Sequence, residues 1–342
     1  MHTTGSKNQT LAQTSAPGII TMMFDKVIVI EISTVCNLSC SFCAHDKRLH
    51  VPRQTIPRDV LLSFTEIIGQ YAKARQQAIL LSWLGGEPFL QRHLLPLTES
   101  LHERYPLHFS ATTNGTQLSD PEIRAHIRRC YAEITLSVDG LSPFHDSMRG
   151  QLGLFDEVKT CIRELANEAP NLKLRINAVL MRDNFEMFPA LCLEFAQCGV
   201  KEITFNQLGG RDRPEFFPTH SLTLEQVQRL PEMVQQIRES IRKFNTQLVF
   251  SSSYFKRILA TTCQKKLPIL DCAPGSFYMF VSAQGKVAPC SFTVDEYGIY
   301  LGSIQSVEDW EQLPALFRQE KMREQARSCL DCPNTNVHGK FT

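Results

Sequence analysis

Three cysteines in one short stretch have the clearest chemical meaning in this sequence. Cys36, Cys40 and Cys43 follow the spacing Cys-x3-Cys-x2-Cys within EISTVCNLSCSFCAHDK. A structural zinc ion takes four ligands, usually in two short pairs, and this stretch offers three. Three thiolates on one loop can bind three irons of a 4Fe–4S cluster and leave the fourth iron open to a substrate or cosubstrate. The spacing therefore favours an iron–sulfur centre over three buried structural thiols.

A second group of cysteines lies near the C-terminus. It consists of Cys272, Cys290 and the pair Cys329-x2-Cys332. Gly285 stands in an Ala-Gln-Gly-Lys turn between two apolar runs, and this pattern predicts a β-hairpin between the first two cysteines. Four thiolates can bind a 4Fe–4S cluster completely, or they can hold a structural zinc ion, and the spacing alone leaves both open.

The other five of the twelve cysteines occur singly. Cys263, in ATTCQKK just upstream of the second group, could replace one of its ligands or act as a free thiol. The remaining four stand in stretches with a helical pattern, where a free cysteine usually behaves as a small hydrophobic side chain. We predict core or helix-face positions for Cys130, Cys161, Cys192 and Cys198.

Composition excludes several classes of protein. The 342 residues are 43% hydrophobic and 21% charged, with a formal net charge of +1, so nothing marks a nucleic-acid or acidic-membrane partner. No apolar run reaches the ~18 residues that a membrane helix needs. The polar, Ser/Thr-rich start lacks the pattern of a secretion signal. We therefore expect a cytoplasmic globular protein, in which cysteines serve metal binding or the core rather than disulfides.

The elements that must position these residues follow an alternating pattern. Short apolar runs alternate with amphipathic stretches, which is typical of repeated βα units and a mainly parallel sheet. Six units predict an α/β fold, a partial (β/α)6 TIM-like barrel, with its site at the carboxyl ends of the strands. The Cys36 loop follows the first strand and belongs to that face. The predicted strands are Val27–Ile32, Ala78–Leu84, Leu107–Thr112, Glu133–Val138, Leu172–Leu180 and Glu202–Gln207.

Four parts are expected along the chain. A flexible tail covers residues 1–24, and the partial barrel covers 25–215, with helices such as Arg58–Ala74 and Asp120–Arg129. Residues 216–250 contain one long helix, Leu222–Phe244, that leaves the barrel. Residues 251–342 form a small module that contains the hairpin and the second cysteine group.

Other polar residues stand at the same strand ends. Adjacent glycines after the second strand would let a ligand approach the backbone closely, and the following carboxylate could bind an ammonium group. Asn-Gly and Asp-Gly are also common turn pairs, so a plain turn stays open for Asn114 and Asp139. In strand order the candidates are Gly85, Gly86, Glu87, Asn114, Ser137, Asp139 and Asn177.

The cysteine loop, together with Phe42 before its third cysteine and the GGEP sequence after the second strand, resembles the radical S-adenosylmethionine (SAM) superfamily. The resemblance implies a 4Fe–4S cluster on the first three thiolates, with the amino and carboxylate groups of SAM on its open iron. The C-terminal pattern resembles the twitch module, a truncated SPASM domain, and implies one auxiliary 4Fe–4S cluster. The implied SAM contacts are Phe42 at the adenine, Gly85, Gly86 and Glu87 at the amino group, Ser137 and Asp139 at the ribose or methionine, and Asn177 on the same ligand.

The resemblance also implies a reaction. A flavodoxin- or ferredoxin-type reductant supplies one electron, SAM is cleaved reductively, and the 5′-deoxyadenosyl radical takes hydrogen from an unactivated carbon. We expect a small-molecule substrate that is dehydrogenated, epimerised or rearranged, with the auxiliary cluster accepting an electron. The alternative is a maturase that crosslinks or epimerises a ribosomally made peptide. The ~24-residue tail is too short for a fused leader-binding domain, although a separate recognition protein would remove that objection. An iron–sulfur carrier without enzymatic activity would not need an open-iron loop.

Two weaker candidates complete the site. Arg211 and Arg213 follow the sixth strand and could bind a carboxylate or phosphate of the substrate, or they could belong to a solvated loop. Cys263 could donate hydrogen to a substrate radical in an epimerase.

Overall fold

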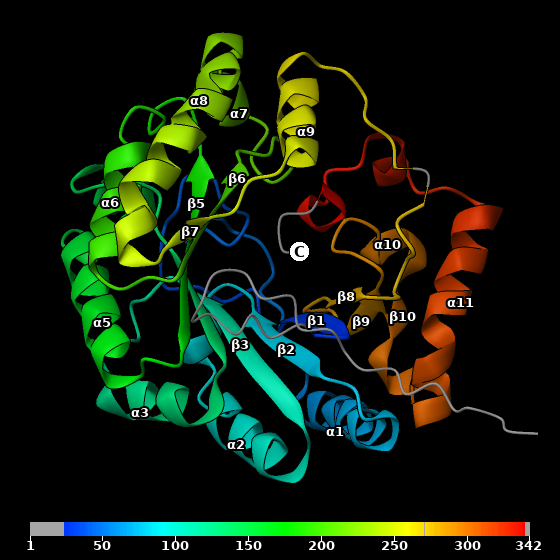
Figure 1. Ribbon diagram of the computed structural model, residues 1–342. Coiled ribbons are helices and arrows are strands. Elements are labelled where there is room, and N and C mark those ends of the chain that lie inside the picture. Colours follow the sequence, from blue (N-terminus) through cyan, green and yellow to red (C-terminus); the bar gives the residue numbers. More distant parts are fainter. Residues whose placement is uncertain (1–23, 270, 339–342) are drawn as a thin grey trace, which may run out of the picture.

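One open sheet organises the molecule (Figure 1). The computed structural model describes residues 24–269 and 271–338, so all of the predicted tail except residue 24 lies outside the described residues. The strands lie in the order β10-β9-β8-β1-β2-β3-β4-β5-β6-β7, and β10 and β7 form the two ends. The first seven strands are β1 (Lys26–Glu31), β2 (Ile79–Leu84), β3 (Leu107–Thr113), β4 (Glu133–Ser137), β5 (Lys173–Leu180), β6 (Glu202–Gln207) and β7 (Gln247–Leu248).

The strands from β1 to β7 are parallel, and their helices cover one side of the curved sheet. This confirms the predicted α/β class and the open form of the barrel, and all six predicted strands occur within two residues of their expected ends. The short strand β7 was not predicted. The helices in this part are α1 (Arg58–Arg75), α2 (Leu94–Arg104), α3 (Pro121–Cys130), α4 (Phe144–Arg149), α5 (Leu154–Glu168), α6 (Phe188–Gln197), α7 (Phe217–His220) and α8 (Leu224–Ile241).

Local sequence explains where these helices begin. Asp120 accepts a hydrogen bond from the Glu122 amide at the start of α3, and proline follows it at the first helical position. Thr223 and Gln226 form a capping box at the start of α8. The long helix predicted from residue 222 to 244 is therefore α8 followed by a 3₁₀ turn at Arg242–Phe244.

The C-terminal part continues the same sheet. Strand β8 (Tyr278–Val281) pairs in parallel with β1, and β9 (Lys286–Ala288) and β10 (Ile299–Tyr300) follow it in antiparallel order. The predicted hairpin is confirmed, and Gly285 adopts a φ of +72° in its turn, a conformation that favours glycine. The pairing of β8 with β1 was not predicted. The division of the chain into domains therefore stays a prediction.

The helices of this part hold it against the rest. They are α9 (Ser252–Thr262), α10 (Val294–Tyr297) and α11 (Val307–Arg323), and α10 and α11 lie beside β8–β10 in Figure 1. Trp310 of α11 is buried edge-on against Phe64 and Tyr71 of α1, with ring centroids 5.9 and 6.1 Å apart. Aromatic pairs of this kind stabilise an interface by about 0.5–1.5 kcal/mol beyond their buried area. No helix in the described part is long and apolar enough to cross a membrane.

Candidate active site

The first three cysteines lie in the loop that leaves β1. Cys40 is buried, Cys36 and Cys43 are partly exposed, and the Cys43 amide donates to the Cys40 carbonyl at 3.1 Å. Burial raises the pKa of Cys40 to about 12; the neighbouring thiols of Cys36 and Cys43 add to the rise, and the Arg149 guanidinium opposes it. The His45 amide donates to the Cys43 sulfur at 3.3 Å. Three thiols on one loop are the donors that the spacing predicts for a cluster bound through three irons, and that cluster stays a prediction.

The two glycines after β2 bring this loop and the strand end together. A Cβ on Gly85 would lie 2.4 Å from the Ser33 carbonyl oxygen, and one on Gly86 would lie 2.2 Å from that of Val35. The Gly86 amide donates to Ser33 at 2.8 Å, and the Glu87 amide donates to Val35 at 3.0 Å. The close approach that the glycines permit here is between two backbones of the protein. Contact with the SAM amino group stays a prediction.

Glu87 is buried against the end of β3. Its carboxylate accepts from the Thr113 hydroxyl at 2.8 Å and from the amides of Asn114 and Phe89 at 2.7 and 3.2 Å. Burial raises its pKa to about 7, although these hydrogen bonds oppose the rise. The carboxyl group therefore fastens β2 to β3 beside the cysteine loop, where Asn114 also donates to the Cys36 sulfur at 3.7 Å.

Asp139 forms a buried ion pair that the sequence did not reveal. Its carboxylate accepts from Arg149 Nε at 2.8 Å and from the Val179 amide at 2.8 Å. The Arg149 guanidinium lies 5.5 Å from the centre of the Phe42 ring and is close enough to Cys40 to lower that thiol's pKa. Arg149 thus connects the end of β4 to the cysteine loop. No local pattern distinguishes Arg149 in the sequence. The one available signal is that a buried carboxylate at Asp139 needs a counter-charge.

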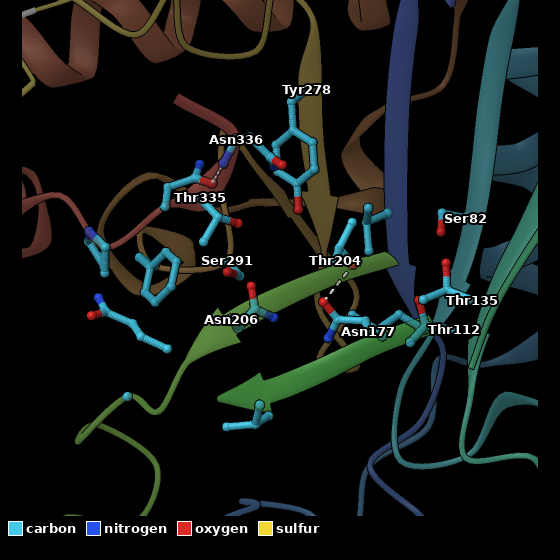
Figure 2. Close-up of a pocket in the computed structure, with 18 of the residues that line it drawn as sticks. Ser82, Thr112, Thr135, Asn177, Thr204, Asn206, Tyr278, Ser291, Thr335 and Asn336 are labelled. Carbon is cyan, nitrogen blue, oxygen red and sulfur yellow. Dashed lines mark hydrogen bonds between the residues drawn. The ribbon is translucent and has the colours of Figure 1, made fainter. Parts of the chain in front are cut away.

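An interior cavity of about 850 Å³ opens beside this loop. Phe42 and Asn177 line it, and Ser137, the last residue of β4, pairs in register with Asn177. Figure 2 shows polar side chains of β2–β6 pointing into this space, opposite Tyr278 and Asn336 from the C-terminal part. The volume lies within the ~300–1,000 Å³ that ligand sites usually have.

Ion pairs line the cavity near the beginnings of β4, β5 and β6. Lys173 lies 3.3 Å from Glu133 and 3.0 Å from Glu202, and Arg175 pairs with the same two carboxylates. Because these four charges neutralise one another, these four side chains offer a ligand no uncompensated charge.

The second cysteine group surrounds a cavity of its own. The four thiols of Cys272, Cys290, Cys329 and Cys332 line a space of about 350 Å³, and Lys321 donates to the Cys272 sulfur at 3.6 Å. Burial raises the pKa of Cys332 to about 11, with further contributions from the other three thiols. No three His, Cys, Asp or Glu side chains among the described residues are placed to hold a single metal ion. Four thiols around one cavity fit the donor set of a larger iron–sulfur cluster.

A buried arginine holds the Cys329–Cys332 turn. Arg257 of α9 donates to the Asp331 carboxylate, which lies between these two cysteines, and to the Cys332 carbonyl at 3.4 Å. The Leu267 amide also donates to Asp331, at 2.9 Å. Arg257 lines the interior cavity, so it connects this cavity to the four-thiol site.

The weaker candidate residues lie in different surroundings. Arg213 pairs with Asp46 at 3.3 Å and with Glu215, which fastens its loop to the segment after Cys43. Arg211 lines the interior cavity and lies 4.3 Å from the centre of the Phe292 ring. Cys263 ends α9 in an exposed position and lines neither cavity. The four cysteines predicted as core residues are all buried: Cys130, Cys161, Cys192 and Cys198.

Comparison with known proteins gives the class of this site. Residues 30–195, just under half of the chain, match the profile of the Radical SAM superfamily. That match implies SAM and a 4Fe–4S cluster as cofactors. The relatives that the chain resembles carry enzyme names.

Three relatives illustrate the likeness. The chain is 31% identical over 203 residues to GTP 3′,8-cyclase of Actinobacillus succinogenes, covering 57% of each chain. It is 23% identical to the sporulation killing factor maturation protein SkfB of Bacillus subtilis, over 76% of this chain and 59% of SkfB. The chain thus spans less than two thirds of the length of these two relatives. Streptococcus suis SuiB, solved bound to the precursor peptide SuiA, superposes with a TM-score of 0.65 at 20% identity, over 91% of this chain and 70% of SuiB.

Proposed function

We propose that the protein is a radical SAM enzyme that abstracts hydrogen from a small molecule held in the interior cavity. The carrying observation is that this cavity extends from Phe42, beside the first three cysteines, to residues that also line the four-thiol cavity. When bound at Cys36, Cys40 and Cys43, a reduced 4Fe–4S cluster supplies the electron that cleaves SAM to a 5′-deoxyadenosyl radical.

The residues of the chain would orient SAM and exclude water. Glu87, held by β3, would meet the methionine amino group, and Phe42 would contact the adenine. Asn177, Ser137 and the Asp139–Arg149 pair would face the ribose or the methionine. Their rigid hydrogen bonds favour the proposal, because radical chemistry depends on fixed positions and on an enclosed space.

The second proposal concerns the four thiols of the C-terminal part. We infer that Cys272, Cys290, Cys329 and Cys332 bind one auxiliary 4Fe–4S cluster in a twitch-type module, which accepts an electron from the substrate. Tyr278 and Phe292 line both cavities, so the two cavities share part of their walls. This shared wall favours electron transfer over a purely structural role.

A peptide substrate is the second candidate function. SkfB, which is named a maturation protein of the sporulation killing factor, and SuiB, which was solved bound to a precursor peptide, favour it. The cavity favours a small molecule, because its volume of about 850 Å³ must also receive SAM.

The experiment that tests the function measures SAM cleavage. The protein is reconstituted without oxygen, reduced by dithionite or by a flavodoxin or ferredoxin, and mixed with small-molecule or peptide pools from source cells. Stimulation of 5′-deoxyadenosine formation by the small-molecule pool supports the proposal, and stimulation by the peptide pool alone supports the maturase. The control variant is Cys36→Ala/Cys40→Ala/Cys43→Ala. Absence of cleavage in the fully iron-loaded wild type would refute both.

A further inference from the structure

The inward faces of β3–β6 are polar at nearly every position. On β5, Lys173, Arg175 and Asn177 line the cavity, while the alternating residues Leu174 and Ile176 are buried on the other face. Strands β3, β4 and β6 alternate in the same way. Lys173, Arg175 and Asn177 already have partners on neighbouring strands, so a ligand would meet the other polar groups of this wall.

Hydroxyl groups form the middle of that wall. We name as the hydroxyl band the five cavity-lining side chains of Ser82, Ser110, Thr112, Thr135 and Thr204. Ser82 pairs in register with Ser110, and Thr112 with Thr135, so these hydroxyls stand beside each other on adjacent strands. Within the described residues, the hydroxyls of Ser82, Ser110 and Thr112 form no hydrogen bond. Figure 2 shows Ser82, Thr112 and Thr135 directed toward the same space.

Every charged side chain along the cavity, within the described part of the chain, already has an opposite charge as partner. The pairs near the beginnings of β4, β5 and β6 are those of Lys173 and Arg175 with Glu133, reinforced by Glu202. Elsewhere, Arg257 pairs with Asp331, and Arg211 pairs with Asp212. A ligand that carried a phosphate or carboxylate to the hydroxyl band would bury a charge against neutral dipoles, which is unfavourable.

We infer that the substrate is a neutral polyhydroxylated small molecule, such as a cyclitol or an unphosphorylated sugar, bound through the hydroxyl band. This assignment rests on the proposed function. Hydroxyls on neighbouring carbons both donate and accept, as serine and threonine hydroxyls do, so one ring can bridge side chains of adjacent strands. Val27, Val29 and Leu80 line the same cavity and offer an apolar surface to the C–H faces of such a ring.

The test uses the reconstituted, SAM-loaded protein with matched pairs of probes. Each neutral probe, myo-inositol or D-glucose, is compared with its charged derivative, myo-inositol 1-phosphate, D-glucose 6-phosphate or D-glucuronate, and with the tetrapeptide Ser-Asn-Thr-Gly. The readouts are 5′-deoxyadenosine formation and the shift of the thermal unfolding midpoint. We expect a neutral probe to raise both and its charged derivatives to raise neither.

Variants of the hydroxyl band test whether the neutral probe binds through it. Thr112→Val removes one hydroxyl and should raise the apparent KM for the active probe about 5- to 10-fold, the value of one hydrogen bond. Thr112→Ser keeps the hydroxyl and should restore binding. Thr65→Val is the matched control, because the Thr65 hydroxyl is buried in α1 and bonds to Leu61 of the same helix.

The outcomes separate this inference from the proposed function. If SAM is cleaved slowly without substrate, but a charged derivative or the tetrapeptide outperforms the neutral probes, the substrate class is wrong and the function stands. Silence of every neutral probe in both readouts would also overturn the class. If SAM is never cleaved, the proposed function itself fails.

Discussion

The two cysteine sites are built in opposite ways. The first takes its thiols from eight consecutive residues of a single loop, Cys36 to Cys43, anchored at the end of β1. The second gathers its thiols from before β8, after β9 and after α11, and Cys332 follows Cys272 by 60 positions. A local loop can assemble early at little entropic cost, whereas the second site forms only when the whole C-terminal part is folded. Cysteine thiols can therefore be brought together either by a short loop or by contacts between distant parts of the chain.

Their charged neighbours differ as well. Beside the first site, Arg149 and Asp139 are both almost completely shielded, with side-chain exposures of 8% and 0%. Beside the second, Arg257 is buried at 3% exposure, but its partner Asp331 is 45% exposed. Loss of Arg149 would therefore leave the Asp139 carboxylate buried without a counter-charge, whereas loss of Arg257 would leave the Asp331 carboxylate hydrated.

The largest predicted effect breaks the first site. Cys40→Ala should lower the iron content from about eight to about four atoms per chain and reduce SAM cleavage to the background without enzyme. The readouts are iron analysis and 5′-deoxyadenosine formation. Cys192→Ala, a substitution of a buried thiol in α6, is the control and should keep both. Normal cleavage by the Cys40 variant would mean that the loop does not carry the catalytic cluster.

Breaking the second site should uncouple the reaction. Cys290→Ala should also lose about four irons, yet keep most of the slow SAM cleavage that occurs without substrate, while product formation disappears. Iron and zinc analysis together with product detection check this expectation. One zinc ion per wild-type chain, with only about four irons, would instead make the second site a structural zinc centre.

The contrast between the sites also explains what the sequence could predict. The spacing of Cys36, Cys40 and Cys43 and the alternating βα pattern both depend on neighbours in the chain. The place of the cysteine loop after the first strand and the parallel strands were therefore predictable. The hairpin at Gly285 was predictable for the same reason.

Features that depend on tertiary contacts were not predicted from the sequence. Arg149 reaches the cysteine loop only because α4 packs beside it, and the pairing of β8 with β1 joins residues about 250 positions apart. The roles of Gly85 and Gly86 were predicted as ligand contacts, whereas in the structure their lack of a side chain admits the backbone of the loop. The polar face of β5 has a local signal, because polar and apolar residues alternate in Lys173–Leu180.

Replacing the buried arginine beside each site should lower the free energy of unfolding by different amounts. Arg149→Met leaves Asp139 as an unpaired buried charge and should cost about 3–5 kcal/mol of unfolding free energy. Arg257→Met should cost less, about 1–2 kcal/mol, because water can hydrate Asp331. Anaerobic urea unfolding of the reconstituted protein measures both, with Arg149→Lys as the charge-conserving control. Equal costs would contradict the difference in burial.

Glu87 gives the first site a pH dependence. Its pKa is about 7 in the folded chain because of burial, above the ordinary value of 4.5, so the folded state holds more protons than the unfolded state between these values. The resulting stability is fully present below pH 4.5 and is lost as the pH rises through 7, by about 2–3 kcal/mol. Unfolding midpoints from pH 5 to 8 should therefore decline, and Glu87→Gln should flatten the decline. A wild-type slope shared by the variant would assign the titration to another group.

The smallest predicted effect distinguishes the two arginines after β6. Arg211 is 58% exposed, is paired with Asp212 and stacks over Phe292, so Arg211→Ala should remove only a cation–π contact of about 0.5–1 kcal/mol. With a neutral substrate, the apparent KM should change less than about threefold. Arg213→Ala should instead loosen the segment after Cys43, because Arg213 binds Asp46, which is buried and also holds Arg48. The Arg213→Ala variant should therefore lose the first cluster faster in air, as measured by visible absorbance, and should keep the wild-type KM for the substrate. A KM raised tenfold or more by Arg211→Ala would show that the loop binds an anionic substrate and would contradict the neutral hydroxyl band as the main recognition surface.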